Sequence, residues 1–187
     1  MTTDKIDTMP YLVAFLFATV ALSIAQTPAS SRLVLALAGD GDLRDELSSR
    51  IAAAGSDTQV RLLGNQTQDE VARWLAAADI VAVPSVRDDS GNVDGLPNVV
   101  LEALASGTPL VTTAAGGIGA VVESGKTAIV VPERDPGALA RAIESLAADP
   151  EQRARIGKAA RELASVRFGW GETARRLEAA YDRALAK

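Results

Sequence analysis

The chain has 187 residues, of which 48% are hydrophobic, and it carries a formal net charge of −5. This length suits one globular domain with a sizeable core, and the acidic balance argues against a nucleic-acid partner. The sequence contains no Cys and no His, which excludes disulfides, cysteine nucleophiles, imidazole or thiolate metal sites and histidine-based acid–base catalysis.

The first 31 residues contain an almost unbroken apolar run at residues 11–25. The run is shorter than the about 20 residues that a membrane span needs. Asp4 and Asp7 flank Lys5 in the preceding segment, which therefore lacks the positive stretch of a signal peptide. We interpret residues 1–31 as an apolar segment that forms a core helix or strand, with a signal peptide or membrane anchor as the alternative. A cytoplasmic location, with the inner face of the membrane as an alternative, is favoured over secretion.

From residue 32 onward, short apolar runs alternate with helical patterns. Strands are predicted at residues 32–38, 60–63, 80–85, 109–113 and 128–131. Helices are predicted at residues 43–54, at 68–79 behind a Thr67–Glu70 capping box, at 97–106, from 135, from 149, and around Leu177 and Leu185. Apolar strands that alternate with helices indicate a doubly wound, Rossmann-like α/β domain with a parallel sheet covered on both faces, here over residues 32–187. In such folds, ligands bind beyond the carboxyl ends of the strands.

The segment DGLPNVVLEALASG, residues 94–107, places a carboxylate in a helix that is apolar around most of its circumference. Such a helix should be buried, and a buried carboxylate is costly unless something pairs with it. Pro97 suits the first turn, and the free N–H groups behind it form a ready anion site. Asp94 and Glu102 could therefore face one pocket and accept hydrogen bonds from sugar or ribose hydroxyls. Alternatively, Asp94 caps the helix and Glu102 bonds a neighbouring backbone group.

Three short motifs lack the pattern of a ligand site. SGKT at residues 124–127 has no first glycine of a phosphate loop, and GDGDLR at residues 39–44 has no third glycine of a dinucleotide fingerprint. DDSGNVD lacks the turn glycine and the final glutamate of a calcium loop. Asp88 and Asp89 are therefore interpreted as part of a solvated loop.

Four blocks in order resemble the C-terminal, donor-binding domain of family 4 glycosyltransferases, the glycosyl transferases group 1. The blocks are AGDGDLRDEL, VRLLGNQTQDEVARWLAAADIVAVPS, DGLPNVVLEALASGTPLVTTAAGGI and VVPERDPGALARAIESLAADPEQRARIGKAAR, and together they cover about residues 32–168. The third block is the most specific, because it matches the family signature of two acidic residues separated by seven others, here Asp94 and Glu102. The resemblance implies half of a GT-B fold. It also implies transfer of a hexose, with retention, from a nucleotide-diphospho-sugar to a glycan or lipid-linked acceptor.

The resemblance also implies a role for each candidate site residue. Glu102 would bind the ribose hydroxyls of the donor and Asp94 its sugar. The main-chain amides of Gly95, Leu96 and Asn98 would lie near the sugar and diphosphate. Gly39 and Gly41 would let the backbone approach the donor closely. Its base and ribose would be bordered by Gly64, Asn65, Pro84 and Ser85. Members of the family need no metal and no cofactor besides the donor, and the leaving phosphate is thought to assist the acceptor at the front face.

The chain departs from the family pattern most clearly upstream. Asp94 stands where the family usually has the longer Glu. The acceptor-binding N-terminal domain, the first strand of the C-terminal domain and the Gly-Arg…Lys diphosphate loop have no convincing counterpart. In a sheet of strand order 3-2-1-4-5-6 that first strand is central. We therefore expect two half-sheets that share no hydrogen bonds, with residues 11–25 recruited to cover the gap or a marginal fold. The missing domain would act in trans on a chain inactive alone; alternatively, the chain is a truncated, non-catalytic module that binds a nucleotide sugar.

Overall fold

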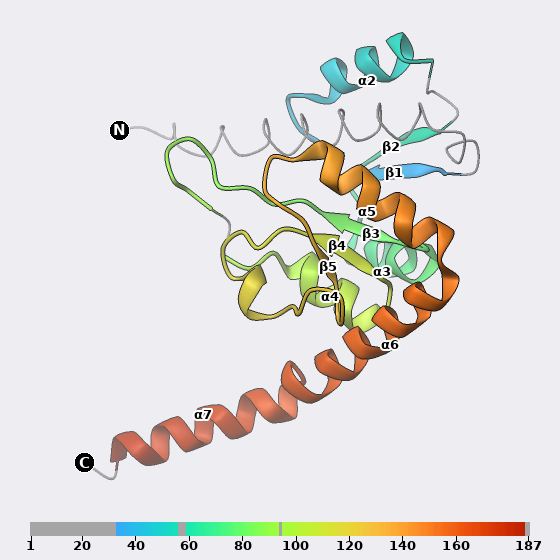
Figure 1. Cartoon of the computed structure of the whole chain (residues 1–187). Coiled ribbons are helices and arrows are strands. Elements are labelled where there is room, and N and C mark those ends of the chain that lie inside the picture. Colours follow the sequence, from blue (N-terminus) through green and yellow to red (C-terminus); the bar gives the residue numbers. More distant parts are fainter. Residues whose placement is uncertain (1–32, 56–58, 94, 186–187) are drawn as a thin grey trace, which may run out of the picture.

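The computed structural model describes residues 33–55, 59–93 and 95–185. Figure 1 shows strands stacked between helices, with the last helix extending away from the rest of the described chain. The apolar run at residues 11–25 and the interpretation of residues 1–31 lie outside the described residues. Within them, no helix is both long and apolar enough to cross a membrane.

Strands and helices follow one another in the predicted order. The elements are β1 (Leu35–Ala38), α2 (Arg44–Ala53), β2 (Val60–Gly64), α3 (Gln68–Ala77), β3 (Val81–Val83), α4 (Asn98–Ser106), β4 (Leu110–Thr112), the 3-10 turn η2 (Ile118–Ala120), β5 (Ile129–Val130), α5 (Pro136–Ala148), α6 (Pro150–Arg167) and α7 (Trp170–Leu185). Most strands are shorter than predicted. The strand expected at residues 80–85 ends at Val83, because Pro84 has no N–H to donate to a ladder.

Side-chain caps fix the starts of three helices. Thr67 and Glu70 form the predicted capping box of α3. Asp135 accepts the N–H of Ala138 at 2.8 Å and Asp149 accepts that of Gln152 at 2.9 Å, each directly ahead of a proline that begins the helix. At α4 the prediction was one residue early, because Pro97 is an extended N-cap residue and the helix begins at Asn98.

The described strands form two separate parallel sheets. One pairs β1 with β2, and the other has the order β3-β4-β5. Among the described residues, β1 has no neighbour on its second edge, and neither has β3. This division is the one that follows from removing the central strand of a 3-2-1-4-5-6 sheet. The expected gap between half-sheets is therefore confirmed for the described chain.

Most of the core belongs to the three-stranded half. Consecutive residues of β4 point to opposite faces: Leu110 packs with α4 and α6, whereas Val111 packs with α5 and Ile156 of α6. The prediction that helices cover both faces holds here. Among the described residues it does not hold for β1, whose Ala36 and Ala38 are exposed while Leu35 and Leu37 pack against α2 and β2. β1 therefore has the alternating burial of a strand with one covered face.

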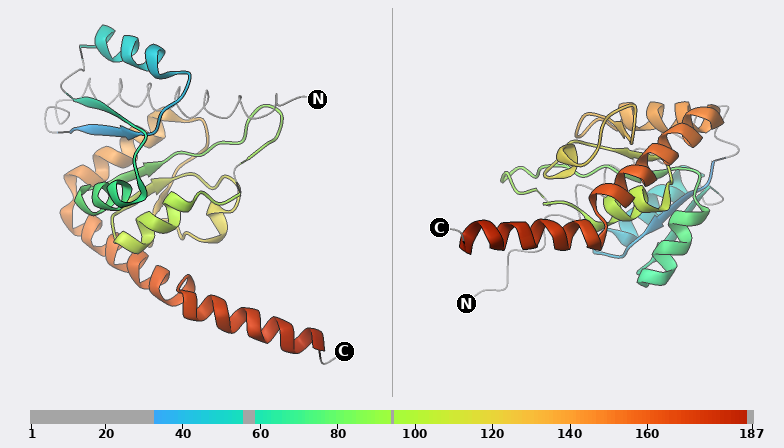
Figure 2. Two further views of the ribbon diagram at one scale, coloured as in Figure 1. Left: turned by 180° about the vertical axis from the view of Figure 1, so that it is seen from behind. Right: turned by 90° about the horizontal axis from the view of Figure 1, so that it is seen from below.

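The C-terminal helix α7 has no buried residue. Its large apolar side chains are exposed, with Trp170 at 90%, Leu177 at 56%, Tyr181 at 63% and Leu185 at 84%. Figure 2 shows α7 following α6 and extending beyond the body of the domain. The described residues therefore leave an apolar helix face without a covering element.

Candidate functional site

The predicted site residues follow the carboxyl ends of strands in both halves of the fold. After β1 and β2, the N–H of Gly39 donates to the carbonyl of Gly64 at 2.8 Å, so these two candidates are in direct contact. Gly41 and Asn65 follow in the adjoining turns and are exposed. This part of the predicted site lies on the two-stranded half.

Pro84 and Ser85 lie just after β3, where hydroxyl groups of Thr112, at the end of β4, and of Thr113, just after it, hold the chain. Thr112 donates its hydroxyl to the carbonyl of Val83 at 2.7 Å, and Thr113 donates to that of Ser85. Pro84 is fully buried, and the side chain of Ser85 is half-buried. The backbone at this strand end is thus fixed in place, as a rigid wall of a binding site requires.

The start of α4 offers unpaired backbone donors. No side chain of the described residues caps this helix. Of its first three N–H groups, only that of Val100 is bonded within the described chain, to the carbonyl of Pro97 at 3.0 Å. The free N–H groups and the positive end of the helix dipole favour an anion such as a diphosphate. Asn98 is exposed at this end, as the predicted role requires.

Gly95 and Leu96 lead into α4 and are held in place by Gly117 and by the hydrophobic core. The carbonyl of Gly95 accepts the N–H of Gly117, and Leu96 packs against the core. A Cβ at position 117 would lie 2.7 Å from the Gly95 oxygen and 3.3 Å from the Leu96 Cβ. Position 117 therefore has no room for a side chain. The close approach of the Gly95 and Gly117 backbones fixes the position of the segment that enters α4.

Replacing Gly117 with Ala is expected to lower the free energy of unfolding by about 2 kcal/mol and to weaken nucleotide binding, because the added methyl group forces Gly95 away from its position. Urea denaturation and isothermal titration calorimetry measure the two effects. Gly119→Ala is the matched control, since its Cβ would meet only Ala114 at an ordinary distance of 3.4 Å. Equal stability and affinity in both variants would contradict the assignment.

Glu102 lies in the middle of α4, and its carboxylate is unpaired within the described part of the chain. Among the described residues it makes no hydrogen bond and no ion pair. The side chain is half-buried, between the exposed Asn98 and Ala105 on the same stripe of the helix. The expectation of a helix buried nearly all round is corrected to this extent, because only Val100, Ala103 and Leu104 are fully enclosed. The alternative in which Glu102 bonds a neighbouring backbone group is not seen.

Asp94 lies outside the described residues, so its role stays a prediction. The loop before it is ordered by another carboxylate. Asp88 accepts the N–H groups of Ser90 and Asn92 at 2.9 and 2.8 Å, and also the Ser90 hydroxyl and the Asn92 amide. Asp88 is thus the centre of a compact turn within an exposed loop, and the side chain of the neighbouring Asp89 is 93% exposed. No pattern in the sequence pointed to Glu133 and Arg134, which also contact this loop.

The order of this turn is expected to depend on pH. The Ser90 hydroxyl lowers the pKa of Asp88 below its ordinary value of 3.8; partial burial opposes this shift and the bonds from Asn92 support it. A lowered pKa in the folded state means that the stabilisation is complete above pH 3.8 and is lost as the pH falls through the lowered pKa. Amide NMR shifts of Ser90 and Asn92 in an acid titration should move together with a midpoint below 3.8. A midpoint at or above that value would contradict this, and Asp88→Asn should remove the transition.

Comparison with known proteins decides the family. The chain matches the profile of the glycosyl transferases group 1 over residues 18–163. It belongs to this family. D-inositol 3-phosphate glycosyltransferase of Nocardioides sp. is 36% identical to this glycosyltransferase chain over 180 residues, covering 90% of the chain and 38% of the relative. The corresponding enzyme of Corynebacterium kroppenstedtii is 38% identical over 133 residues, covering 71% of the chain and 28% of the relative. The chain thus spans about a third of the length of the curated relatives that it matches.

Solved structures define the part of the fold that is present. HepE of Anabaena, in complex with UDP and glucose, superposes with a TM-score of 0.74 at 25% identity, covering 88% of this chain and 44% of HepE. The C-terminal domain of the glycosyl transferase group 1 protein LpcC of Francisella tularensis superposes with a TM-score of 0.74 at 20% identity, covering 86% of this chain and 82% of that domain. The fold is therefore that of the Rossmann-like half of a GT-B glycosyltransferase, as the motifs predicted.

Proposed function

We propose that this chain is the donor-binding half of a family 4 glycosyltransferase. The complete enzyme would transfer a hexose, with retention, from a nucleotide-diphospho-sugar to a glycan or lipid-linked acceptor. The half-buried carboxylate of Glu102 carries this proposal, because it has no partner among the residues that the structure describes and lies one turn behind the N–H groups at the start of α4. A carboxylate in this position suits the two hydroxyls of a ribose, and the N–H groups suit the diphosphate attached to it.

The other candidates complete the proposed donor site. Asp94 would bind the sugar, while the amides of Gly95, Leu96 and Asn98 would bind at the sugar and diphosphate. The base and ribose would rest on two backbone walls made by Gly39, Gly41, Gly64, Asn65, Pro84 and Ser85. We propose that binding needs no metal and no cofactor, so that EDTA leaves nucleotide affinity unchanged, and that the protein acts in the cytoplasm.

The unpartnered surfaces of the chain support a second component. The edges of β1 and β3 and the apolar face of α7 have no covering element among the described residues. We propose that an acceptor-binding domain acts in trans and that the chain alone transfers no sugar. The alternative function is that of a non-catalytic nucleotide-sugar-binding module.

Nucleotide binding tests the proposal. UDP, GDP and ADP are titrated separately, and the melting temperature of the full chain is followed. One of them at 100 times its dissociation constant should add about 2.7 kcal/mol to the free energy of unfolding. If all three leave the melting temperature unchanged at millimolar concentration, the donor-site assignment is wrong. Sugar transfer by the chain alone would instead contradict the need for a second domain.

A further inference from the structure

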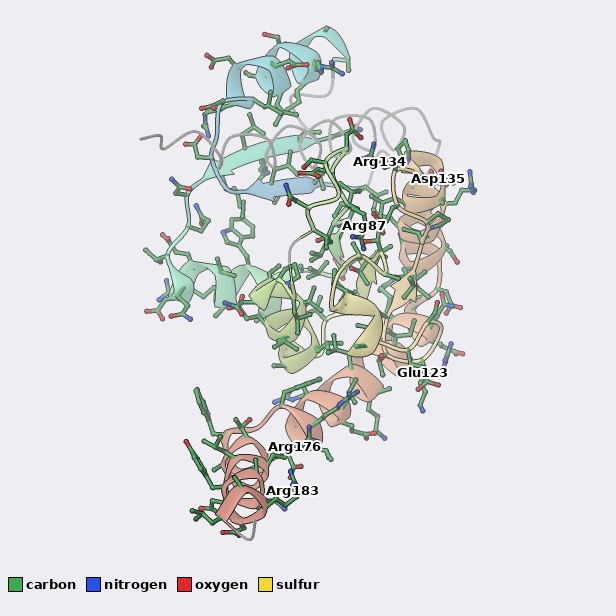
Figure 3. All side chains as sticks on the ribbon, turned by 90° about the vertical axis from the view of Figure 1, so that its left-hand side faces the viewer. Arg87, Glu123, Arg134, Asp135, Arg176 and Arg183 are labelled. Atoms are coloured by element: carbon green, nitrogen blue, oxygen red, sulfur yellow. The ribbon has the colours of Figure 1, made fainter. Side chains whose placement is uncertain are left out.

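Two loops at the carboxyl end of the three-stranded sheet are fastened together by side chains of Glu133 and Arg134. The Glu133 carboxylate accepts the N–H of Arg87 at 2.7 Å. Arg134 donates to the carbonyl of Arg87 at 2.6 Å and pairs with the Asp89 carboxylate at 2.8 Å. Arg87 and Arg134 lie on neighbouring loops in Figure 3. These contacts, here called the loop clamp, join the loop after β5 to the loop after β3, across the intervening β4.

The two bonds to the backbone of Arg87 are the important part of the loop clamp. The Asp89 side chain is 93% exposed and that of Arg134 is 43% exposed, so their ion pair contributes little in water. The bonds to Arg87 each pair a charged side chain with a backbone group, which makes them stronger than neutral hydrogen bonds. They occupy both the N–H and the carbonyl of one residue. The loop clamp therefore fixes the course of the main chain at Arg87.

Arg134 makes these contacts from a strained backbone. Its φ of 59° is the one positive value at a non-glycine residue in the part of the chain that the structure describes. A glycine would adopt this conformation without strain, but it would have no side chain to reach the loop after β3. Strained residues persist where their surroundings impose the conformation, and they are concentrated at functional sites.

Further contacts hold described residues on both the β3 side and the α4 side of this loop. Val86 is buried just before Arg87, and Asp88 braces the turn that follows. At the far end, the carbonyl of Gly95 is bonded to Gly117. The loop thus has contacts at Val86 to Asn92 and again at Gly95. It is the connection that carries the main chain from β3 to the amides assigned to the sugar and diphosphate.

We infer that Glu133 and Arg134 are positioning residues for the sugar of the donor, an inference that rests on the proposed function. They touch the loop and not the ligand. Their effect is to hold the β3–α4 loop in one arrangement before the donor arrives, so that binding the sugar does not have to order it. The nucleotide itself, bound through Glu102 and the end of α4, depends less on this loop.

The test uses the full chain and the variants Arg134→Gly and Arg134→Lys. Calorimetry measures dissociation constants for whichever of UDP, GDP and ADP binds in the screen above, and for its glucose conjugate. Arg134→Gly removes the side chain and relieves the backbone strain, so the melting temperature should not fall. The dissociation constant of the sugar-nucleotide, divided by that of the nucleotide, should rise about tenfold. This change corresponds to one charge-assisted hydrogen bond. Arg134→Lys, which keeps a cationic donor, should recover most of the loss.

A change of less than twofold in this ratio for Arg134→Gly would overturn the inference, as would an equal loss for nucleotide and sugar-nucleotide. Glu133→Ala should change the ratio in the same direction, whereas Glu133→Gln keeps an oxygen acceptor and should change it little. If the wild-type chain binds none of the three nucleotides, the proposed function fails, and this inference fails with it. Nucleotide binding with an unchanged ratio overturns the inference alone.

Discussion

Replacing Gly157 with Ala is expected to lower the free energy of unfolding by about 3 kcal/mol, since inserting a methyl group into a closed contact is strongly destabilising. A Cβ at this position would lie 2.1 Å from the carbonyl oxygen of Gly107 and 3.2 Å from its carbon. Both are backbone atoms and cannot turn aside as a side chain could. Relief therefore requires α6 to move away from the end of α4. Urea denaturation followed by circular dichroism measures the loss.

Gly107 itself has a backbone conformation that favours glycine. It ends α4 in the left-handed region with φ of 76°, and its own Cβ would meet the Gly157 carbonyl at 3.3 Å. Gly171→Ala is the matched control for Gly157→Ala. Gly171 lies in α7 with open space around it. Alanine there should raise the free energy of unfolding by at most about 1 kcal/mol. Wild-type stability in Gly157→Ala would show that α4 and α6 are not packed as described.

Replacing Glu102 with Gln is expected to weaken nucleoside diphosphate binding about 10- to 100-fold, the range of one or more hydrogen bonds to a charged group. The variant keeps the shape of the side chain but loses the charge that strengthens its bonds to ribose hydroxyls. The free energy of unfolding should stay within about 0.5 kcal/mol of the wild type. The reason is that the carboxylate has no protein partner among the described residues. Calorimetry and urea denaturation on the same samples separate the two quantities.

Glu162→Gln is the control for Glu102→Gln, because Glu162 is an exposed carboxylate on α6. It should retain both affinity and stability. A Glu102→Gln variant that binds nucleotide as well as the wild type would remove this residue from the proposed site. A variant that is strongly destabilised would instead give Glu102 a structural role.

The periodic features of the fold were predictable from the sequence. Apolar runs and capping residues such as Thr67 and Asp135 act locally. Helices and strands can therefore be recognised from them without the tertiary structure. The division of the described strands into two sheets was also predictable, because the family resemblance implied a strand order in which the central strand had no counterpart here. Strand lengths were less accurate, since they depend on where a neighbouring strand ends.

The details of the site depended on contacts between distant segments. Glu133 and Arg134 reach residues 46 and 47 positions away, and nothing in the local pattern of the β5–α5 loop marks them. The partial exposure of Glu102 likewise follows from how α4 is packed, which a helical wheel does not determine. For Asp94 the assignment still rests on the family motif alone.

Binding of the donor ribose by Glu102 is tested most directly by a cycle of two changes, one in the protein and one in the nucleotide. Dissociation constants are measured for the nucleoside diphosphate that binds and for its 2′-deoxy form, with the wild-type chain and with Glu102→Gln. The wild type should prefer the ribonucleotide by about tenfold, as one charge-assisted hydrogen bond implies. This preference should largely disappear in Glu102→Gln. The same preference in both proteins would contradict the claim, because the ribose hydroxyl would then be recognised elsewhere.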